Sequence, residues 1–257
     1  MNKINNKIFI STQPNDSYYE LESSLKNTGV LLYHYPMIEV EESSFTTQET
    51  DLINNITNYN WLVFTSKNGV IYFLKKINQI FKSLQILENI KIAVIGQKTA
   101  NEFTKIGITP TYISKSNLAE KFANELVESV IKKDSNVLLL LGNIANTTLE
   151  NKLKNHCNYI RINCYNTIPV KNEYPELIRK VNKNEYDLII FTSSLCFVNF
   201  AQLLIKNKIN VSNIKAVSIG KPTSKTMKEY EVEPLITAQQ SNIEGLVKEI
   251  FQYYKLK

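Results

Sequence analysis

Glycine and proline are scarce in this chain. Its 257 residues include only 7 of each, where average usage would give roughly 18 and 13. Loops that bind phosphate groups depend on glycine, and neither G-x-G-x-x-G nor G-x-x-x-x-G-K-[ST] occurs anywhere in the sequence. We therefore expect no nucleotide cofactor.

Residues that bind metals are also few, with 3 cysteines and 2 histidines. No pair of them has the C-x-x-C or H-x-x-x-H spacing of a zinc site. An odd number of cysteines suits a reducing compartment, where such thiols are mostly small buried hydrophobes. We expect no metal and no cofactor. The candidates excluded as metal ligands are His34, His156, Cys157, Cys164 and Cys196.

Long apolar runs are missing as well. The first residues, MNKINNKIFIST, contain no apolar stretch of the length that a signal peptide needs. Apolar runs such as residues 137–141 are far too short to cross a bilayer. The sequence therefore predicts a cytoplasmic protein that does not bind membranes.

The formal net charge is +6, with an isoelectric point of about 9.0. Only Arg161 and Arg179 among the 30 basic residues are arginines, although nucleic-acid recognition favours the guanidinium group. The lysines are scattered rather than clustered with aromatic residues. We therefore expect no nucleic-acid partner, while a small polyanionic substrate remains compatible with the charge.

The chain repeats itself, and this is its most informative feature. Residues 59–77 align without gaps with residues 186–204, which places one F-T-S motif on the other. Residues 91–113 align in the same way with 215–237 and share the pattern I-G-x-x-T. An S-N pair follows in each copy. The sequence thus predicts a tandem duplication of a unit of about 128 residues, which is within the size range of a single domain.

Each repeat alternates short apolar runs with amphipathic stretches. Such alternation predicts parallel sheets with helices on both faces, and hence an α/β protein with two doubly wound domains. The last helix of the first repeat has apolar residues on one face, from Leu118 to Val130, behind a Ser116/Asn117 cap. In the first repeat we expect strands at 7–12, 30–36, 61–66, 91–96 and 110–113, and helices at 67–77, 98–106 and 117–133.

Both repeated motifs lie where a strand ends and a helix begins. Ligands of open α/β sheets bind beyond the carboxyl ends of the strands, and helix N-termini there attract anions. Glycine at 96 and 220 would let the backbone turn sharply and a ligand approach. If the equivalent loops of two domains faced a common cleft, they would suit a ligand with several acidic groups. The candidates are Thr65, Ser66, Gly96, Thr99, Thr192, Ser193, Ser194, Gly220, Lys221 and Thr223.

A simpler interpretation stands beside this one. Serine and threonine before a helix are ordinary N-caps, each worth about 1 kcal/mol of stability. An exposed lysine such as Lys221 is usually just solvated. The residue types alone leave both interpretations open.

The ordered set of motifs resembles the uroporphyrinogen-III synthase family. It consists of F-T-S, I-G-x-x-T and S-N, repeated twice, and the tract Tyr165-Asn166-Thr167-Ile168-Pro169 resembles the family's Y-x-T-x-P linker signature. The resemblance implies two flavodoxin-like domains, 1–36 with 169–257 and 40–165. A two-stranded hinge linker at 37–39 and 166–168 would join them, in a monomer.

The resemblance also implies a reaction. The family converts hydroxymethylbilane, a linear tetrapyrrole with several carboxylates, into uroporphyrinogen III by removing water, inverting ring D and closing the ring. No cofactor takes part. Tyr165 matches the family's tyrosine near the leaving hydroxyl, Thr99 and Thr223 match ligand-loop residues, and Lys221 is a carboxylate partner. From its residue type alone, Tyr165 could equally be an aromatic that packs against the hinge.

The chain departs from the family pattern at three places. Ser11-Thr12-Gln13 stands where many members have an arginine, Leu141-Gly142-Asn143 replaces an Arg-Gly pair, and Leu195 replaces a small residue or proline. An inactive paralogue and a non-enzymatic two-domain binding protein therefore remain alternatives. A receiver-type regulatory protein would need an aspartate at a strand end, and neither F-T-S motif is followed by one.

Overall fold

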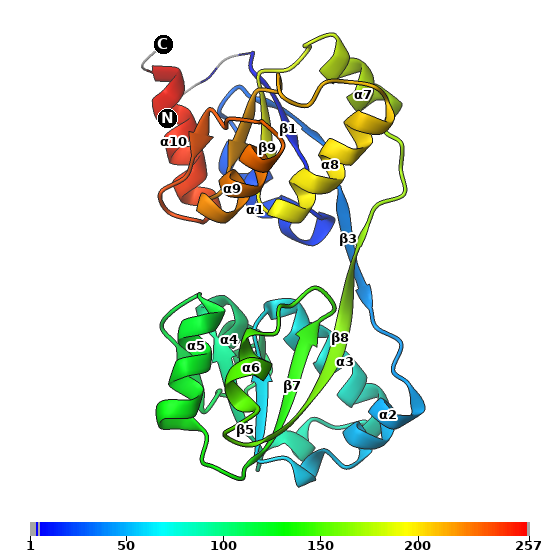
Figure 1. Cartoon of the computed structure of the whole chain (residues 1–257), viewed down its shortest axis with the longest axis vertical. Helices are drawn as coiled ribbons and strands as arrows, with labels where there is room; N and C mark the ends of the chain where they lie inside the picture. The colour runs from blue at the N-terminus through cyan, green and yellow to red at the C-terminus, as the bar shows by residue number, and fades with distance from the viewer. Residues whose placement is uncertain (1–3, 5, 256–257) are drawn as a thin grey trace. The chain divides into compact units, whose positions relative to one another are not determined.

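The structure, a computed structural model, describes residue 4 and residues 6–255. The chain forms two compact units, which we describe separately. Unit 1 contains the chain up to Glu39 and again from Ile168 onward, and unit 2 is the continuous segment Val40–Thr167. In Figure 1, the blue and the yellow-to-red segments together make up unit 1, and cyan and green segments make up unit 2.

Unit 1 is built on a five-stranded sheet in the order β11-β10-β9-β1-β2, in which all neighbours pair in parallel. The central strands β1 and β9 are almost entirely buried apolar runs, as strands covered on both faces require. The strands are β1 (Ile8–Ser11), β2 (Leu31–His34), β9 (Leu188–Phe191), β10 (Ala216–Ser218) and β11 (Ile236–Thr237).

Helices cover both faces of this sheet. Leu21 and Leu246 bring α1 (Asn15–Leu25) and α10 (Ile243–Lys255) onto one face, into a shared apolar cluster. On the other face, α7 (Pro175–Asn182), α8 (Ser194–Lys206) and α9 (Lys221–Glu229) pack through residues such as Leu177, Phe200 and Met227. Unit 1 therefore has the three layers of a doubly wound domain.

Unit 2 repeats this arrangement around a sheet in the order β3-β8-β7-β4-β5-β6. One face carries α2 (Thr47–Asn54), α3 (Lys67–Phe81) and α4 (Gly96–Thr104), and the other carries α5 (Ala119–Glu125) and α6 (Thr148–Leu153). The strands are β3 (Ile38–Glu42), β4 (Trp61–Phe64), β5 (Lys91–Ile95), β6 (Tyr112–Ser114), β7 (Asn136–Gly142) and β8 (Asn158–Pro169).

The two sheets share one strand order. The sequence β2-β1-β9-β10-β11 of unit 1 corresponds to β8-β7-β4-β5-β6 of unit 2. Along the chain, unit 1 has the flavodoxin-like order 2-1-3-4-5, and unit 2 has a circular permutation of it, 5-4-1-2-3. The prediction of two doubly wound parallel-sheet domains is confirmed. Each sheet, however, combines strands from both sequence repeats. The chain passes between the units within β3 and β8, and a hinge at 37–39 and 166–168 stays a prediction.

Most expected elements are present, and the exception is the helix predicted at 117–133. It begins at Ala119 and ends as a π-helical turn, Leu126–Val130. The predicted Ser116/Asn117 cap is wrong. The hydroxyl of Ser116 accepts the N–H of Leu118, which immediately precedes the helix, and no side chain at the N-cap position accepts an N–H of the first turn. Leu118 consequently lies outside the helical periodicity and is 60% exposed. In the second repeat, Asn242 does cap α10 by accepting the N–H of Gly245 at 2.7 Å.

Candidate functional site

A pocket of about 330 Å³ lies in unit 2 at the carboxyl ends of its central strands. Its walls come from the ends of β5 and β7, from the segments that follow β4, β6 and β7, from the helices α5 and α6, and from β8. This is the edge of an open α/β sheet where ligands bind. Three of the sequence-predicted residues meet here. The lining residues are Thr65, Ser66, Ile95, Asn117, Ala119, Leu141, Ile144, Ala145, Asn146, Leu149 and Tyr165.

The hydroxyls of Ser66 and Tyr165 lie within hydrogen-bonding distance. Ser66 Oγ and Tyr165 Oη are 3.0 Å apart, although the two residues are separated by 99 positions in the chain. Ser66 also caps α3, because its Oγ accepts the N–H of Gly69 at 3.1 Å. The capping and binding interpretations of this serine are therefore compatible, and one side chain orients both the helix and the tyrosine.

A slip in strand pairing sets the position of Tyr165. Leu141 of β7 lies opposite Asn163 of β8, but the next residue, Gly142, lies opposite Tyr165. Bulges of this kind redirect side chains and are common beside active sites. Tyr165 is thus inside a long strand rather than at its end.

Gly142 and Tyr72 complete the surroundings of Tyr165, and the sequence analysis identified neither in this role. A Cβ atom on Gly142 would lie 2.5 Å from Tyr165 Cζ and 2.7 Å from its Oη, so only glycine leaves room for the phenol. The ring of Tyr72 stacks on that of Tyr165, with centroids 6.0 Å apart. The hydroxyl of Tyr72 donates to the Val40 carbonyl.

Gly96 and Thr99 lie near this pocket without lining it. Gly96 has a φ of +71°, which favours glycine, so the predicted sharp turn is confirmed. A Cβ atom there would lie 2.5 Å from Asn117 Oδ1, so the group that approaches this glycine is a side chain of the pocket wall. Thr99 is 4% exposed, inside α4.

In unit 1, the hydroxyl residues after β9 serve local hydrogen bonds. Ser193 caps α8, because its Oγ accepts the N–H of Cys196 at 3.1 Å. Ser194 Oγ accepts a hydrogen bond from the hydroxyl of Thr226 at 3.0 Å. Thr192 is half-buried at the end of the strand. Capping is therefore observed for Ser193.

The loop after β10 corrects the prediction for Gly220. Its φ of 172° is ordinary extended backbone, so no left-handed turn requires glycine there. The requirement is steric instead, since a Cβ atom would collide with the hydroxyl of Ser241. Thr223 is 4% exposed within α9, and Lys221 is exposed at the start of that helix.

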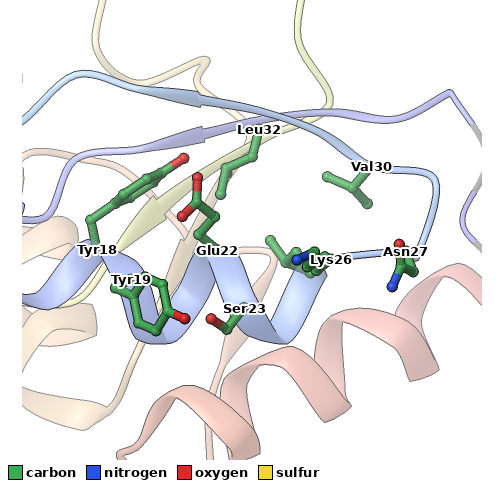
Figure 2. Close-up of a pocket in the computed structure, with 9 residues that line it drawn as sticks. Tyr18, Tyr19, Glu22, Ser23, Lys26, Asn27, Val30 and Leu32 are labelled. Atoms are coloured by element: carbon green, nitrogen blue, oxygen red, sulfur yellow. The ribbon is translucent and has the colours of Figure 1, made fainter.

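A second pocket, of about 480 Å³, lies in unit 1 between α1 and the edge strand β2. Figure 2 shows Tyr18 and Glu22 on α1, Lys26 directly after this helix, and Leu32 across from them. The ring of Tyr18 stacks on His34 at 3.8 Å between centroids, and burial lowers the pKa of His34 against the opposing effects of the Gln13 carbonyl and Glu22. None of the predicted site residues lines this pocket. The unit 2 pocket is therefore the better candidate.

Two other kinds of site can be assessed for the described part of the chain. Within residue 4 and residues 6–255, no three His, Cys, Asp or Glu side chains are grouped so that they could hold a metal ion. Over the same residues, no helix has both the length and the apolar character needed to cross a bilayer.

Comparison with known proteins gives one consistent family. The family model described as "Uroporphyrinogen-III synthase HemD" matches residues 19–248. The "Porphyrin biosynthesis protein HemD" of Ruminiclostridium josui is 26% identical over 246 residues, and the chain spans 47% of that relative's length. The "Putative uroporphyrinogen-III synthase" of Methanocaldococcus jannaschii is 27% identical over 253 residues, which cover 94% of this chain and 96% of that protein.

Solved structures are similar in fold. A mutant uroporphyrinogen III synthase from the extremely thermophilic bacterium Thermus thermophilus matches with a TM-score of 0.67 at 13% identity, covering 98% of this chain and 100% of that one. A uroporphyrinogen-III synthetase from Helicobacter pylori matches with a TM-score of 0.62 at 16% identity, covering 96% and 99%. At these identities the likeness shows the two-domain α/β architecture alone.

Proposed function

The chain belongs to the uroporphyrinogen-III synthase family, as its repeated motifs predict, and on that premise we propose that it converts hydroxymethylbilane into uroporphyrinogen III in haem biosynthesis. In this reaction the terminal C–O bond breaks and water leaves. Ring D then inverts through a spiro intermediate and the macrocycle closes. No electron is gained or lost overall, so the reaction needs no redox cofactor, and the proposal includes no cofactor of any kind. As predicted from the sequence, the proposal describes a cytoplasmic monomer.

The observation that carries this proposal is the Ser66–Tyr165 pair at the wall of the unit 2 pocket. Tyr165 Oη acts as the acid that assists departure of the hydroxyl group as water. When Ser66 donates to Tyr165 Oη, the bond uses a lone pair of that oxygen and not the phenolic proton, which Tyr165 gives to the leaving hydroxyl while Ser66 stabilises the phenolate that forms. The phenolate regains a proton when ring closure releases one from a pyrrole carbon. One residue pair thus supplies both the proton and the support for the resulting charge.

The size of the pocket suits part of the substrate. At about 330 Å³ it lies near the lower end of the range of about 300–1,000 Å³ for small-molecule sites. We assign it to the reacting end of the tetrapyrrole. Holding that end in one orientation favours cyclisation with inversion over the spontaneous closure that gives isomer I.

The remaining predicted residues are assigned to the substrate's carboxylates. They lie just before or within the first turns of α3, α4, α8 and α9, and the net charge of +6 favours a polyanion. Lys221, exposed at the start of α9, supplies a mobile positive charge. The residues given this role are Thr65, Gly96, Thr99, Thr192, Ser193, Ser194, Gly220, Lys221 and Thr223.

The test is incubation with freshly generated hydroxymethylbilane and separation of the product isomers. We expect isomer III from the natural protein and only isomer I from a control without enzyme. Y165F should lower the rate of isomer III formation by about 10²- to 10⁴-fold, as loss of a general acid does. Y159F, on the same strand and away from the pocket, is the matched control and should keep full activity.

Two outcomes would contradict the proposal. If the folded natural protein gives only isomer I, it is an inactive paralogue or a binding protein. If Y165F keeps full activity while its folding is unchanged, the reaction stands but the assignment of Tyr165 is wrong.

A further inference from the structure

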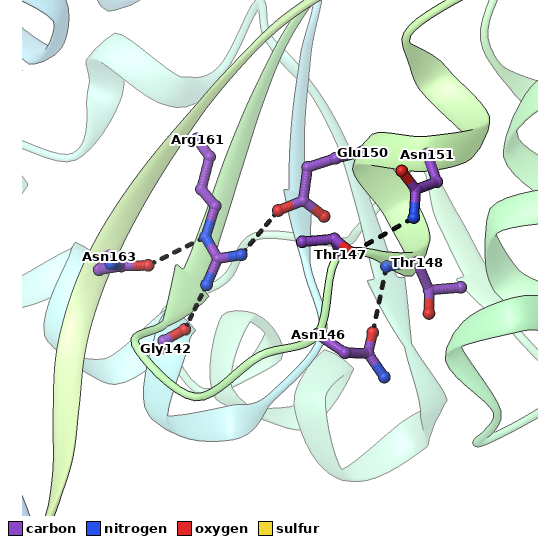
Figure 3. Close-up of polar contacts among 8 residues, drawn as sticks. All are labelled: Gly142, Asn146, Thr147, Thr148, Glu150, Asn151, Arg161 and Asn163. Carbon is purple, nitrogen blue, oxygen red and sulfur yellow. Dashed lines mark hydrogen bonds and ion pairs between the residues drawn. The ribbon is translucent and has the colours of Figure 1, made fainter.

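Arg161 is one of only two arginines in the chain, and each of its three guanidinium nitrogens donates a hydrogen bond inside unit 2. Nη1 donates to Glu150 Oε1 at 2.6 Å, Nη2 to the Gly142 carbonyl at 2.9 Å and Nε to Asn163 Oδ1 at 3.0 Å. Figure 3 shows these three bonds spreading from one planar group to three different segments. The side chain is 21% exposed, so the bonds are largely shielded from water.

The three segments all adjoin the pocket. Gly142 ends β7, Glu150 lies in α6, and Asn163 lies on β8 two residues before Tyr165. The loop between β7 and α6 contributes Ile144, Ala145 and Asn146 to the pocket wall. Arg161 therefore holds both ends of that loop against the strand that carries the tyrosine.

The Gly142 carbonyl is the contact that links Arg161 to Tyr165. It lies at the slip in pairing, where Gly142 is opposite Tyr165. The Gly142 backbone lies close against the end of the phenol ring, because a Cβ added to this glycine would lie 2.5 Å from Tyr165 Cζ. A change in the orientation of the Gly142 peptide therefore changes the backbone contact that fixes the position of Tyr165 Oη.

We propose that Arg161 is a positioning residue that fixes the Gly142 peptide at the strand slip and, through it, the Tyr165 hydroxyl at the pocket. This inference rests on the proposed function of Tyr165. Arginine suits the task because its guanidinium is planar and rigid and can serve three acceptors in different directions. A lysine ammonium keeps the charge but is a point donor on a flexible stem, so it cannot maintain all three bonds.

The decisive variant is R161K, compared with R179K as a matched control. Arg179 is the other arginine, and its ion pair with Glu185 lies on the surface of unit 1, where such pairs contribute little. We expect R161K to lower kcat for isomer III about 10- to 100-fold and to leave KM for hydroxymethylbilane within about twofold. A displaced general acid stabilises the transition state less, while the affinity for the substrate is unchanged. R179K should keep both constants.

A second measurement separates positioning from general stability and needs no activity. In protein labelled with 3-fluorotyrosine, Y165F identifies the ¹⁹F resonance of Tyr165. We expect R161K to shift that resonance and R179K to leave it in place. If R161K does not fold, E150Q removes one partner of the guanidinium and should shift the resonance in the same way with a smaller loss of kcat.

The inference is overturned if R161K folds with natural kcat, or if the Tyr165 resonance does not move. It is also overturned if the loss is in KM alone. Failure of the proposed function is a different result, because the natural protein then makes no isomer III while the resonance experiment still reports on Arg161.

Discussion

Substituting Gly142 by alanine tests how tightly the position of Tyr165 is controlled. The added Cβ would lie 2.5 Å from Tyr165 Cζ, 2.7 Å from Oη and 2.8 Å from Cε2. Carbon atoms in contact normally lie about 3.5–4.0 Å apart, so the ring must retreat by about 1 Å. A displacement of this size disturbs the hydrogen bond between Tyr165 Oη and Ser66 Oγ, which now lie 3.0 Å apart.

The expected loss of activity follows from this distance. A misplacement of about 1 Å in a catalytic group can cost about 100-fold in rate, which corresponds to about 2.7 kcal/mol in the barrier. The cost in stability is smaller. Overpacking costs about 1–3 kcal/mol, and the lower entropy of the unfolded alanine chain returns about 0.4–1 kcal/mol, because Gly142 has no positive φ that alanine would strain. G142A should therefore remain folded.

The assay is the initial rate of isomer III formation at saturating hydroxymethylbilane, with urea unfolding measured on the same samples. G107A is the control for a general cost in stability. Gly107 belongs to the same unit, has a φ of +79° and has nothing within 4 Å of a built Cβ. It should lose about 1–2 kcal/mol of stability through backbone strain and keep its rate.

The rate of the double variant G142A/Y165F tests whether Gly142 acts through Tyr165. If Gly142 acts only through Tyr165, the double variant is no slower than Y165F alone, because the two changes remove the same contribution. Losses that multiply would show that Gly142 acts elsewhere. A natural rate in folded G142A would refute the steric reasoning altogether.

Three further predictions concern stability and reactivity. N143A removes two bonds to the Thr167 backbone, of 2.8 and 3.3 Å, and should lower the free energy of unfolding in urea by about 1–3 kcal/mol; an unchanged midpoint would contradict it. Burial opposes the charge of Asp187, but the Ile8 amide and Lys7 together hold its pKa below the ordinary value. The carboxylate therefore stabilises the fold fully above about pH 3.9, and this contribution is lost as the pH falls through its lower folded pKa. D187N should accordingly be less stable at pH 7 and flatten the acid limb of a stability–pH curve, and an unaltered curve would refute this. Burial raises the pKa of the three thiols, those of Cys157, Cys164 and Cys196. Ellman's reagent at pH 8 should therefore react with them quickly only after the protein unfolds, and rapid reaction with the folded protein would contradict this prediction.

The sequence predicted where the helices and strands lie better than it predicted which strands pair with one another. Buried parallel strands such as β4 and β9 are continuous apolar runs, which local composition reveals. The pairing of Phe9 with Leu188 follows from no local pattern, because the energy comes from contacts between segments that are remote in sequence. The predicted position of Leu118 failed for a different, local reason, since Leu118 donates its N–H to the hydroxyl of Ser116 before the helix begins.

From residue types alone the candidate site was predictable only where it follows a general rule, and Tyr165 was predicted from the family's linker signature instead. Ser66 lies at a strand end before a helix, and that rule found it. Gly142 was missed as a steric requirement because it has no positive φ, and only the closeness of Tyr165 gives it a role. Arg161 had one available signal, its rarity among 30 basic residues, but rarity names no partner.

The composition of unit 1 from two distant segments has a consequence for synthesis on the ribosome. Lys7, at the start of β1, is joined to Asp187, 180 residues further along. At about 5–20 residues per second, β1 waits roughly 9–36 s for β9 to be made. Unit 2, a continuous segment, is completed within that interval. The apolar strand Ile8–Ser11 can pair with β2 during this period but lacks its other neighbour, β9, so one of its edges is open to a chaperone that binds extended apolar segments.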